Sequence, residues 1–335
     1  MKQKAYTLLL TLMTLAMFSS CNDEWTEELY EHYVSFKAPI NSDGVSRINV
    51  RYKAGEPSVY ELPLVVSGST NNQKNLTVKI AIDPDTLEVL NEARFSNRTD
   101  LYYKLLPAQY YSFPETVEIK AGENTALLNI SFNLGNLDLV EKWVLPITIE
   151  ESSTGEYTPN YRKHYRKALL RVMPFNDYSG TYAGGALQNT LMNAGEGVDN
   201  PPLVKSDIVT YTVDDNTIFF YAGTVDETRK DRGLYKLKAQ FFEGGRVELT
   251  CENGDSEHMD FKLNKPAAFD ISEEMDDVLP YLKKRTIMIR NIDYEYTDYT
   301  MAPGARISYH VTGEMTIQRN INTQIPDEDQ AIQWD

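Results

Sequence analysis

The densest cluster of side chains that could bind a ligand is the sequence DYEYTDY at residues 293–299. Tyr294 and Tyr296 would share one face of a strand, with two carboxylates on the other face. A tyrosine ring can stack on the apolar face of a sugar while its phenol hydrogen-bonds a hydroxyl. The chain has 22 tyrosines but only 3 tryptophans, so tyrosine is the candidate stacking ring. We predict Tyr294, Tyr296 and Tyr299 as ligand-binding residues; the alternative is that these rings face a core.

Two further tyrosine pairs flank the sequence LLPAQ in the first half of the chain. They are Tyr102 with Tyr103, and Tyr110 with Tyr111. This region lacks a strand pattern, so large aromatic side chains have less structural reason to be there than in a strand. We predict these four as additional ligand-binding residues, with packing against the domain as the alternative.

Enzymatic motifs are missing from the sequence. A glycoside hydrolase needs two carboxyl groups at a fixed separation, and nothing local selects a pair among the 49 acidic residues. The sequence also contains no GxSxG, P-loop or GxGxxG motif. We therefore expect no catalytic residues and a protein that is not an enzyme.

Metal and cofactor motifs are equally scarce. The four histidines are far apart in sequence and form no HxH or HExxH pattern. The acidic sequences at 214–216 and 276–277 could bind calcium through oxygen ligands, but neither has EF-hand spacing. We predict no cofactor and no transition metal, and leave calcium open against ordinary turn chemistry.

The N-terminal residues have the pattern of an export signal, which we assign to residues 1–20. Lys2 and Lys4 precede an apolar run of 14 residues, which as a helix would span about 21 Å and is too short for a bilayer core of about 30 Å. The junction sequence FSSC resembles the lipobox of bacterial lipoproteins. This resemblance implies cleavage before Cys21 and lipid attachment to that cysteine, a stable membrane anchor when two or more acyl chains are present.

The first residues after Cys21 are strongly acidic, and we interpret residues 21–32 as a lipidated tether. They resemble the acidic stretch that follows the acylated cysteine in Bacteroides-type surface lipoproteins, which implies exposure on the outer membrane. The formal net charge is −16, and removal of Lys2 and Lys4 with the signal makes it more negative. Such a charge repels phosphate backbones and anionic lipids. We therefore exclude nucleic acid as a partner and attribute membrane association to the lipid alone.

Cys251 is the only other cysteine. With Cys21 acylated it has no disulfide partner, and its acidic neighbours do not favour a reactive thiolate. We interpret it as a buried apolar residue. The fold must then be stabilised by its hydrophobic core, which a chain of this length can supply as two domains.

Apolar residues alternate with other residues over much of 33–174, the pattern of half-buried strands. About seven such strands favour an immunoglobulin-like β-sandwich. Pro63 and Pro146 interrupt two of them, so we expect those strands to lie at an edge or to break there. Asp83 as cap and Pro84 in the first turn predict one helix over residues 83–95.

A second all-β domain is predicted over residues 175–335. Hairpins are expected around 214–216 and 244–245, and about eight consecutive strands favour a lipocalin-like up-and-down barrel, with a second sandwich as the alternative. A short helix is predicted from Ser272 to Pro280. Residues 184–203 have no period and are interpreted as a long loop.

The chain resembles a known family of two-domain surface lipoproteins from Bacteroides-type polysaccharide utilisation systems. The similar segments are the acidic start running into YVSFKAP, the segments at 103–126 and 136–152, the junction NDYSGTYAG and the tail at 312–334. The resemblance implies an immunoglobulin-like domain followed by an all-β domain, both from families of undefined function. It also implies a partner pair, a surface lipoprotein and a porin-like transporter. It assigns no ligand residues.

Three functions are compatible with these features. The preferred one is a non-catalytic surface protein that binds extracellular polysaccharide or oligosaccharide, because rigid β domains with tyrosine-rich loops suit neutral ligands. The second is a structural or adhesive surface protein that binds another protein. The third is a glycoside hydrolase. An exposed aromatic platform would favour the first, an exposed apolar patch or open edge strand the second, and a carboxylate pair in a cleft the third.

Overall fold

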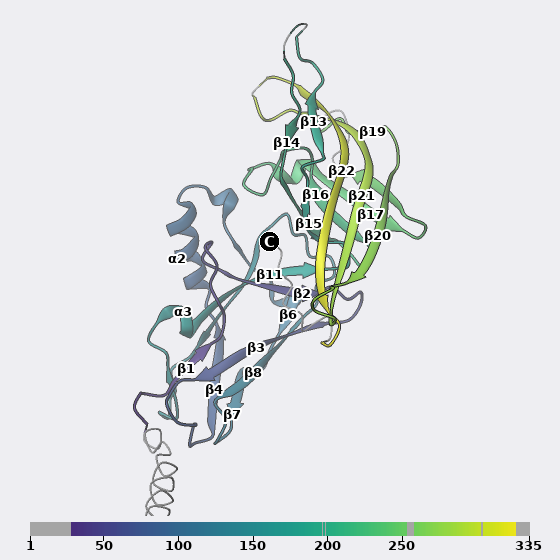
Figure 1. Ribbon diagram of the computed structural model, residues 1–335. Coiled ribbons are helices and arrows are strands. Elements are labelled where there is room, and N and C mark those ends of the chain that lie inside the picture. The colour runs from purple at the N-terminus through teal and green to yellow at the C-terminus, as the bar shows by residue number, and fades with distance from the viewer. Residues whose placement is uncertain (1–27, 196, 198, 253–257, 303, 326–335) are drawn as a thin grey trace, which may run out of the picture.

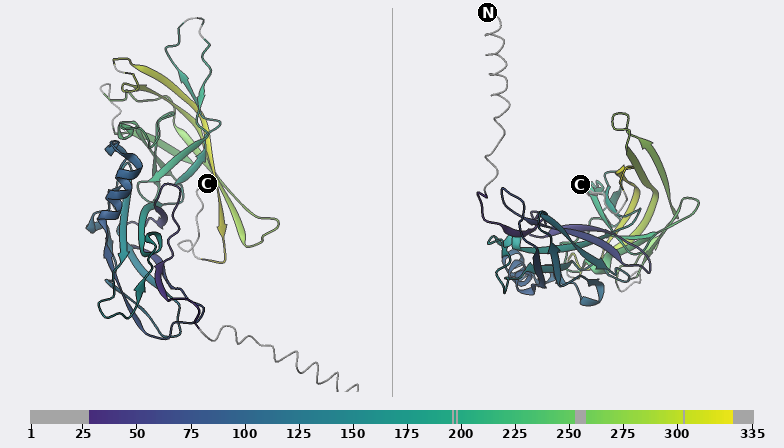
Figure 2. Two further views of the ribbon diagram at one scale, coloured as in Figure 1. Left: turned by 90° about the vertical axis from the view of Figure 1, so that its left-hand side faces the viewer. Right: turned by 90° about the horizontal axis from the view of Figure 1, so that it is seen from below.

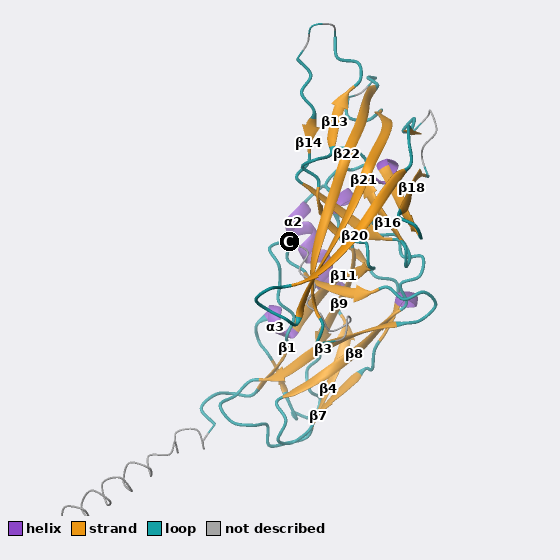
Figure 3. Ribbon diagram, turned by 45° about the vertical axis from the view of Figure 1, so that its right-hand side comes forward, coloured by secondary structure: helices purple, strands orange, loops and turns teal. Residues whose placement is uncertain are grey.

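The computed structural model describes residues 28–325 except 196, 198, 253–257 and 303 (Figure 1). Helices make up 9% and strands 48% of the structure, which confirms the predicted all-β class (Figure 3). Curled sheets form the N-terminal part, and a closed barrel of eight strands forms the C-terminal part beside it (Figures 1 and 2). The predicted signal peptide, Cys21 and most of the predicted tether lie outside the described residues.

The N-terminal part contains one sheet with the strand order β10-β1-β3-β8-β6. Its longest pair is antiparallel β3 and β8, whose alternate side chains are buried as the period-2 pattern predicts. β1 pairs antiparallel with β3 but parallel with β10. The strands are β1 (Tyr33–Phe36), β3 (Ser58–Val66), β6 (Tyr111–Ser112), β8 (Thr125–Phe132) and β10 (Thr158–Pro159).

A second sheet has the order β2-β11-β9-β4-β7, with β5 pairing to β9. β2 and β11 run parallel, while β11, β9, β4 and β7 are antiparallel neighbours. The described N-terminal part thus has more than the expected seven strands, because two-residue strands leave no periodic signal. This sheet consists of β2 (Ser46–Arg51), β4 (Leu76–Ile82), β5 (Lys104–Leu105), β7 (Thr116–Ile119), β9 (Trp143–Ile149) and β11 (Lys167–Phe175).

Both strand prolines lie in interior strands that continue past them, so neither the predicted edge position nor the predicted break is observed. Pro63 is in β3 between β1 and β8, and Pro146 is in β9 between β11 and β4. Each proline carbonyl accepts a bond from the residue just after a neighbouring strand ends, Lys37 after β1 and Asp83 after β4. In an antiparallel sheet the N–H and C=O of one residue point to the same neighbouring strand. The N–H that each proline lacks would therefore point to where β1 or β4 ends, so its absence removes no bond from the middle of a ladder and costs little stability.

The predicted helix over 83–95 is confirmed as α2 (Pro84–Phe95). Asp83 occupies the N-cap position, but its carboxylate binds Thr86 and Lys167 instead of a backbone N–H. No helix among the described residues is long and apolar enough to cross a bilayer. The other helices are short: α3 (Lys163–Arg166) and the 3-10 turns η2 (Thr99–Leu101), η3 (Ala108–Tyr110) and η4 (Arg232–Tyr235).

The C-terminal barrel is the predicted up-and-down meander. Its ring runs β12-β15-β16-β17-β18-β20-β21-β22 and closes where β22 pairs with β12. Each of these pairs is antiparallel, and the predicted turns at 214–216 and 244–245 join successive strands. The ring strands are β12 (Gly180–Ala183), β15 (Asp207–Thr212), β16 (Thr217–Tyr221), β17 (Lys236–Phe242), β18 (Arg246–Cys251), β20 (Ala267–Met275), β21 (Leu282–Asp298) and β22 (Ile307–Asn322).

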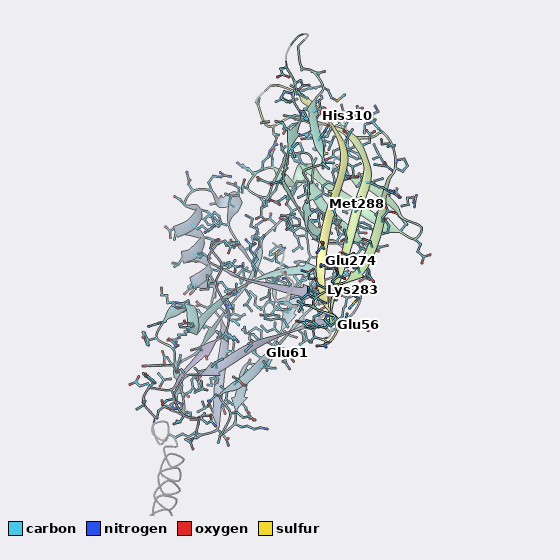
Figure 4. All side chains as sticks on the ribbon, viewed as in Figure 1. Glu56, Glu61, Glu274, Lys283, Met288 and His310 are labelled. Atoms are coloured by element: carbon cyan, nitrogen blue, oxygen red, sulfur yellow. The ribbon has the colours of Figure 1, made fainter. Side chains whose placement is uncertain are left out.

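Three short strands extend the ring: β13 (Gln188–Leu191), β14 (Leu203–Val204) and β19 (Lys262–Leu263). β13 pairs with residues 309–312 near the start of β22, so the predicted loop over 184–203 is wrong at β13. The predicted helix from Ser272 is also wrong, because Ser272 lies in β20 and pairs with Thr286 of β21. Long-range pairing with β21 outweighs the local capping signal. The antiparallel pair of β21 and β22 is long. In Figure 4, Lys283 of β21 and His310 of β22 lie near its opposite ends.

Large aromatic side chains fill the barrel. Tyr182, Tyr294 and Tyr296 are among the largest fully buried residues, and a barrel of eight strands is narrow enough for side chains to fill it. All five residues of β16 are buried. Because side chains alternate across a strand, both faces of β16 are covered. The barrel is therefore a packed core and not a channel.

Candidate functional site

An open pocket of about 510 Å³ lies at one end of the barrel. We call it the mouth pocket. It forms where the segment between β16 and β17, residues 222–235, meets the end of β21 and the start of β22. Its size suits a small ligand. The lining residues are Thr224, Val225, Asp226, Thr228, Arg229, Lys230, Asp231, Tyr296, Asp298, Thr300, Met301 and Tyr309.

Arg229 is the organising cation of the mouth pocket. Its guanidinium donates to Asp231 through Nε at 2.8 Å and to Asp298 through Nη1 and Nη2, with Thr300 as a further acceptor. The face of the guanidinium lies 4.5 Å from the ring centre of Tyr235, a favourable cation–π arrangement. Arg229 thus fixes residues from two loops that are 69 positions apart in sequence.

Asp298 is almost completely buried, with a side chain 2% exposed. Burial alone raises the pKa of this carboxyl, but the bonds from Arg229, from the backbone N–H groups of Thr300 and Met301, and from the Tyr235 hydroxyl together lower it well below its usual range. The pKa of Asp231 is also lowered: burial opposes the shift, and Arg229 and Thr300 cause it. Both carboxyls are therefore ionised at neutral pH.

The floor of the mouth pocket is aromatic. The rings of Tyr296 and Tyr309 stack with centres 5.3 Å apart, and Tyr235 lies edge-on to Tyr296. Tyr296 and Tyr235 are fully buried and Tyr309 is 7% exposed. A ligand in the mouth pocket would therefore rest above a closed floor and could not pass into the barrel.

The N-terminal domain holds the mouth segment in place. Arg232, which is 3% exposed, donates to the carbonyls of Asp100 and Val140 in that domain and to the carbonyl of Arg229 in the mouth pocket. Arg98 also donates to the Thr228 carbonyl at 3.2 Å. The segment between β16 and β17 thus both contacts the N-terminal domain and lines the mouth pocket.

A second contact fixes the same segment from behind. The buried side chain of Arg171 in β11 binds the Glu227 carboxylate at 3.0 Å, and Tyr211 of β15 donates to the same oxygen. Burial raises the pKa of Glu227, but Arg171, Lys142 and Tyr211 outweigh it and lower the pKa to about 2. The carboxylate therefore remains charged between the two domains.

Two of the tyrosines predicted from the DYEYTDY sequence are inside the barrel. Tyr294 is 0% and Tyr296 is 1% exposed, and the Tyr294 hydroxyl accepts a bond from the backbone N–H of Gly223. Neither ring can form an exposed stacking surface, because the alternate face that carries them is the interior one. Tyr296 nevertheless contributes to the floor of the mouth pocket. Tyr299 is half-buried nearby, with the Arg306 guanidinium 5.3 Å from its ring centre.

The other four predicted tyrosines are in the N-terminal domain. Tyr102 and Tyr103 both contact Phe95 at the end of α2, and Tyr103 is only 4% exposed. Tyr111 begins β6 at the edge of the sheet that contains β8, Tyr110 directly precedes it, and both pack against the core. The structure thus gathers each pair separately, and none of the four lines the mouth pocket.

Catalytic and metal chemistry have little geometric support within the described part of the chain. No group of three or more His, Cys, Asp or Glu among those residues could hold a metal ion. The two carboxyls bound by Arg229 have lowered pKa values, whereas the general acid of a glycoside hydrolase needs a raised one. Cys251, predicted to be buried, is only partly buried; it packs against the core beside Met259 and does not line the mouth pocket.

The key residues of the mouth pocket were not predicted from the sequence. Asp226, Arg229, Lys230 and Asp231 form a charged run within the sequence TVDETRKDRG at 224–233. A polar segment between two apolar strands was the available signal, because binding residues collect on loops. It could not show that Asp298 and Thr300 would join them.

Two family models match the chain. A domain of unknown function, DUF4973, matches residues 25–153, and a model of a C-terminal domain matches residues 166–316. No curated protein matches. Solved structures do match over nearly their whole length, among them the following three.

The first of these structures is a multidomain protein from Bacteroides ovatus that includes DUF1735. It shares 42% identity over 90% of this chain and 100% of its own, with a TM-score of 0.79. The second is described as an auxiliary nutrient binding protein from Bacteroides thetaiotaomicron, with 43% identity over 91% of this chain and 100% of its own and a TM-score of 0.79. A third, of unknown function from B. ovatus, shares 36% identity over 89% and 95%, with a TM-score of 0.77. The chain therefore belongs to the family of these two-domain Bacteroides proteins, in which a DUF4973 domain precedes the C-terminal barrel domain.

Proposed function

We propose that this protein is a non-catalytic binding protein that captures extracellular glycans for an uptake system at the cell surface. The observation that carries the proposal is the mouth pocket, which sets hydroxyls, carboxylates and an exposed methionine above a tyrosine floor. Such a mixture suits a ligand with many hydroxyl groups and small apolar patches. The similarity to a nutrient binding protein of the same two-domain build supports this class of function.

Membrane attachment through Cys21 completes the proposal. The described chain starts at the end of the N-terminal domain that lies away from the barrel (Figure 1). A lipid near that end would anchor the N-terminal domain at the outer membrane and place the barrel farther from the membrane surface. A glycan captured there would be passed to a surface lipoprotein and porin-like transporter pair. Replacement of Cys21 by alanine should abolish labelling by a fatty acid analogue and release the protein from the membrane.

A binding role fits the electrostatics better than hydrolysis does. A hydrolase would need one carboxyl held protonated near neutral pH. In the mouth pocket, Arg229 lowers the pKa of both carboxyls that it contacts. A glycan incubated with the protein should therefore be recovered without new reducing ends.

The test is calorimetric titration of a soluble form that starts at Asn22, and so lacks the lipidated cysteine, with host and plant glycans. We expect saturable binding of at least one glycan, and at least tenfold weaker binding after Met301→Ala, which removes an exposed pocket side chain without altering the core. Met192→Ala is the matched control, because Met192 is also exposed but does not line the mouth pocket. The absence of heat with every glycan, or rapid cleavage of one, would contradict the proposal.

A protein-binding role is the second candidate, and one surface favours it. The hairpin between β20 and β21 exposes Met275, Val278, Leu279 and Tyr281, with Val278 82% exposed. Exposed apolar clusters of this kind often mark protein contacts. If this surface is functional, Val278→Asp should impair glycan uptake by cells while leaving the glycan titration of the purified protein unchanged.

A further inference from the structure

We infer that the mouth pocket selects neutral glycans and rejects those that carry carboxylate or sulfate groups. The inference rests on the proposed function and specifies the ligand class of that site. It follows from how the charged side chains of the mouth pocket are already used.

Arg229 has no free pair of donors left for an anionic ligand. A guanidinium has five N–H donors. Nε donates to Asp231, Nη2 is shared among Asp231, Asp298 and Thr300, and Nη1 donates to Asp298, so these bonds leave one N–H of Nη1. The ring of Tyr235 covers one face of the guanidinium. Bidentate recognition of a uronate or sulfate requires a free fork of donors, and the arginine of this pocket does not offer one.

The remaining cation is a single exposed lysine. Lys230 faces a lining that also contains Asp226, Asp231 and Asp298, so the aspartates outnumber the two cations. Arg229 compensates much of the charge on Asp231 and Asp298, while Asp226 binds Thr228 instead of a cation. An anionic sugar would therefore meet net negative charge, and the low dielectric of a partly enclosed site strengthens that repulsion.

The same arrangement favours hydroxyl donors. Only Oδ1 of Asp226 accepts bonds from Thr228, and the side chain is exposed, so its carboxylate can accept from a ligand hydroxyl. The Asp231 carboxylate is 23% exposed and can do the same. Charge-assisted bonds from neutral hydroxyls are strong. Met301, 64% exposed, offers apolar contact to a sugar face.

The test compares neutral and anionic probes on the same protein. The soluble form that starts at Asn22 is titrated with mannan, galactan and levan as neutral glycans, and with polygalacturonan, chondroitin sulfate and heparin as anionic ones. We expect binding to at least one neutral glycan, and at least a hundredfold weaker binding of every anionic probe at low salt. Raising the salt concentration should leave neutral binding almost unchanged, because no ion pair forms with the ligand.

Charge variants separate the pocket from the rest of the surface. Asp226→Lys should weaken neutral binding at least tenfold and allow measurable binding of an anionic probe, because it reverses an exposed charge in the mouth pocket. Asp215→Lys is the matched control, since Asp215 is exposed in the β15–β16 turn and is not among the lining residues. Asp215→Lys should change neither the binding of neutral glycans nor that of the anionic probe.

The outcomes distinguish the two proposals. Preference of the unaltered protein for an anionic glycan would overturn the neutral-ligand inference and leave glycan binding intact. Glycan binding that responds equally to Asp226→Lys and Asp215→Lys would overturn the assignment to the mouth pocket. No binding of any probe would overturn the proposed function, and the inference with it.

Discussion

Arg171 of β11 and Glu227 of the mouth segment form an ion pair of 3.0 Å that joins the two domains directly behind the mouth pocket. The arginine side chain is 6% exposed and the glutamate 33%. Removing one partner of a buried pair leaves the other charge uncompensated. The position of the binding segment therefore depends on electrostatics contributed by the neighbouring domain.

We predict that Glu227→Gln destabilises the protein in a pH-dependent way. The pKa of Glu227 is lowered from 4.5 to about 2 in the folded state, so the pair stabilises the fold fully above pH 4.5 and loses its effect as the pH falls towards 2. At pH 7 we expect a loss of about 2 kcal/mol after allowance for solvent screening. Urea unfolding at pH 7 and pH 3 measures it. The exposed Glu243→Gln is the control, and a constant difference at both pH values would contradict the prediction.

Arg232→Met is expected to weaken glycan binding although Arg232 does not line the mouth pocket. The substitution keeps the apolar volume but removes the donors that tie Arg229 to the Asp100 and Val140 carbonyls. Affinity should fall about tenfold because the binding segment is no longer preorganised. Hydrogen exchange over residues 224–231 should rise in parallel.

The control for this change is Arg246→Met, an exposed arginine on β18. It should affect neither affinity nor exchange. Arg232→Lys retains the charge and should restore part of the binding. Unchanged exchange over 224–231 in Arg232→Met would show that Arg232 does not position the segment.

Gly223→Ala is expected to be strongly destabilising. Gly223 has a φ of +53°, and a Cβ there would lie 2.2 Å from the Tyr296 hydroxyl and 2.9 Å from Nδ2 of Asn189. Backbone strain and steric overlap together should cost about 3 kcal/mol. Thermal and urea unfolding would measure this cost.

A double substitution tests the cause. Tyr296→Phe removes the nearest clashing atom, so Gly223→Ala should cost less in that background than in the unaltered protein. Gly185→Ala, where a Cβ meets nothing within 4 Å, should be nearly neutral. Equal costs in both backgrounds would rule out overlap with the Tyr296 hydroxyl.

Glu28→Gln is expected to loosen the start of the described chain. The Glu28 carboxylate accepts bonds from the backbone N–H groups of Tyr30, Ser69 and Thr70 and pairs with His32 at 2.7 Å. The hydroxyl of Thr70 and these backbone bonds lower the pKa of Glu28 far below its usual value, so the contact persists well into the acidic range.

Limited proteolysis should detect the change. Cleavage around residues 28–32 and hydrogen exchange over 67–70 should both increase in Glu28→Gln at pH 7. Glu56→Gln, an exposed residue in a different loop (Figure 4), should behave like the unaltered protein. Equal cleavage in all three proteins would mean that Glu28 does not hold this segment.

Local sequence patterns determined much of the fold. Alternating apolar residues predicted strands such as β4 and β8, and Asp83 with Pro84 predicted the helix that begins there. Turn residues at 214–216 and 244–245 predicted two hairpins of the barrel, and consecutive strands with short links predicted its meander. These features could be predicted because hydrophobic period, helix capping and turn chemistry act over a few residues.

The tertiary structure alone decided the binding site. Period 2 placed Tyr294 and Tyr296 on one strand face, but only closure of the barrel made that face the interior. Arg229 meets Asp298 across 69 positions because β16 and β21 end at the same rim. Residues 268–275 form a strand because all eight pair with β21, although the local capping signal at Ser272 predicted a helix there. Strand pairing and charge neutralisation between distant segments depend on the closed fold, and no short stretch of sequence encodes them.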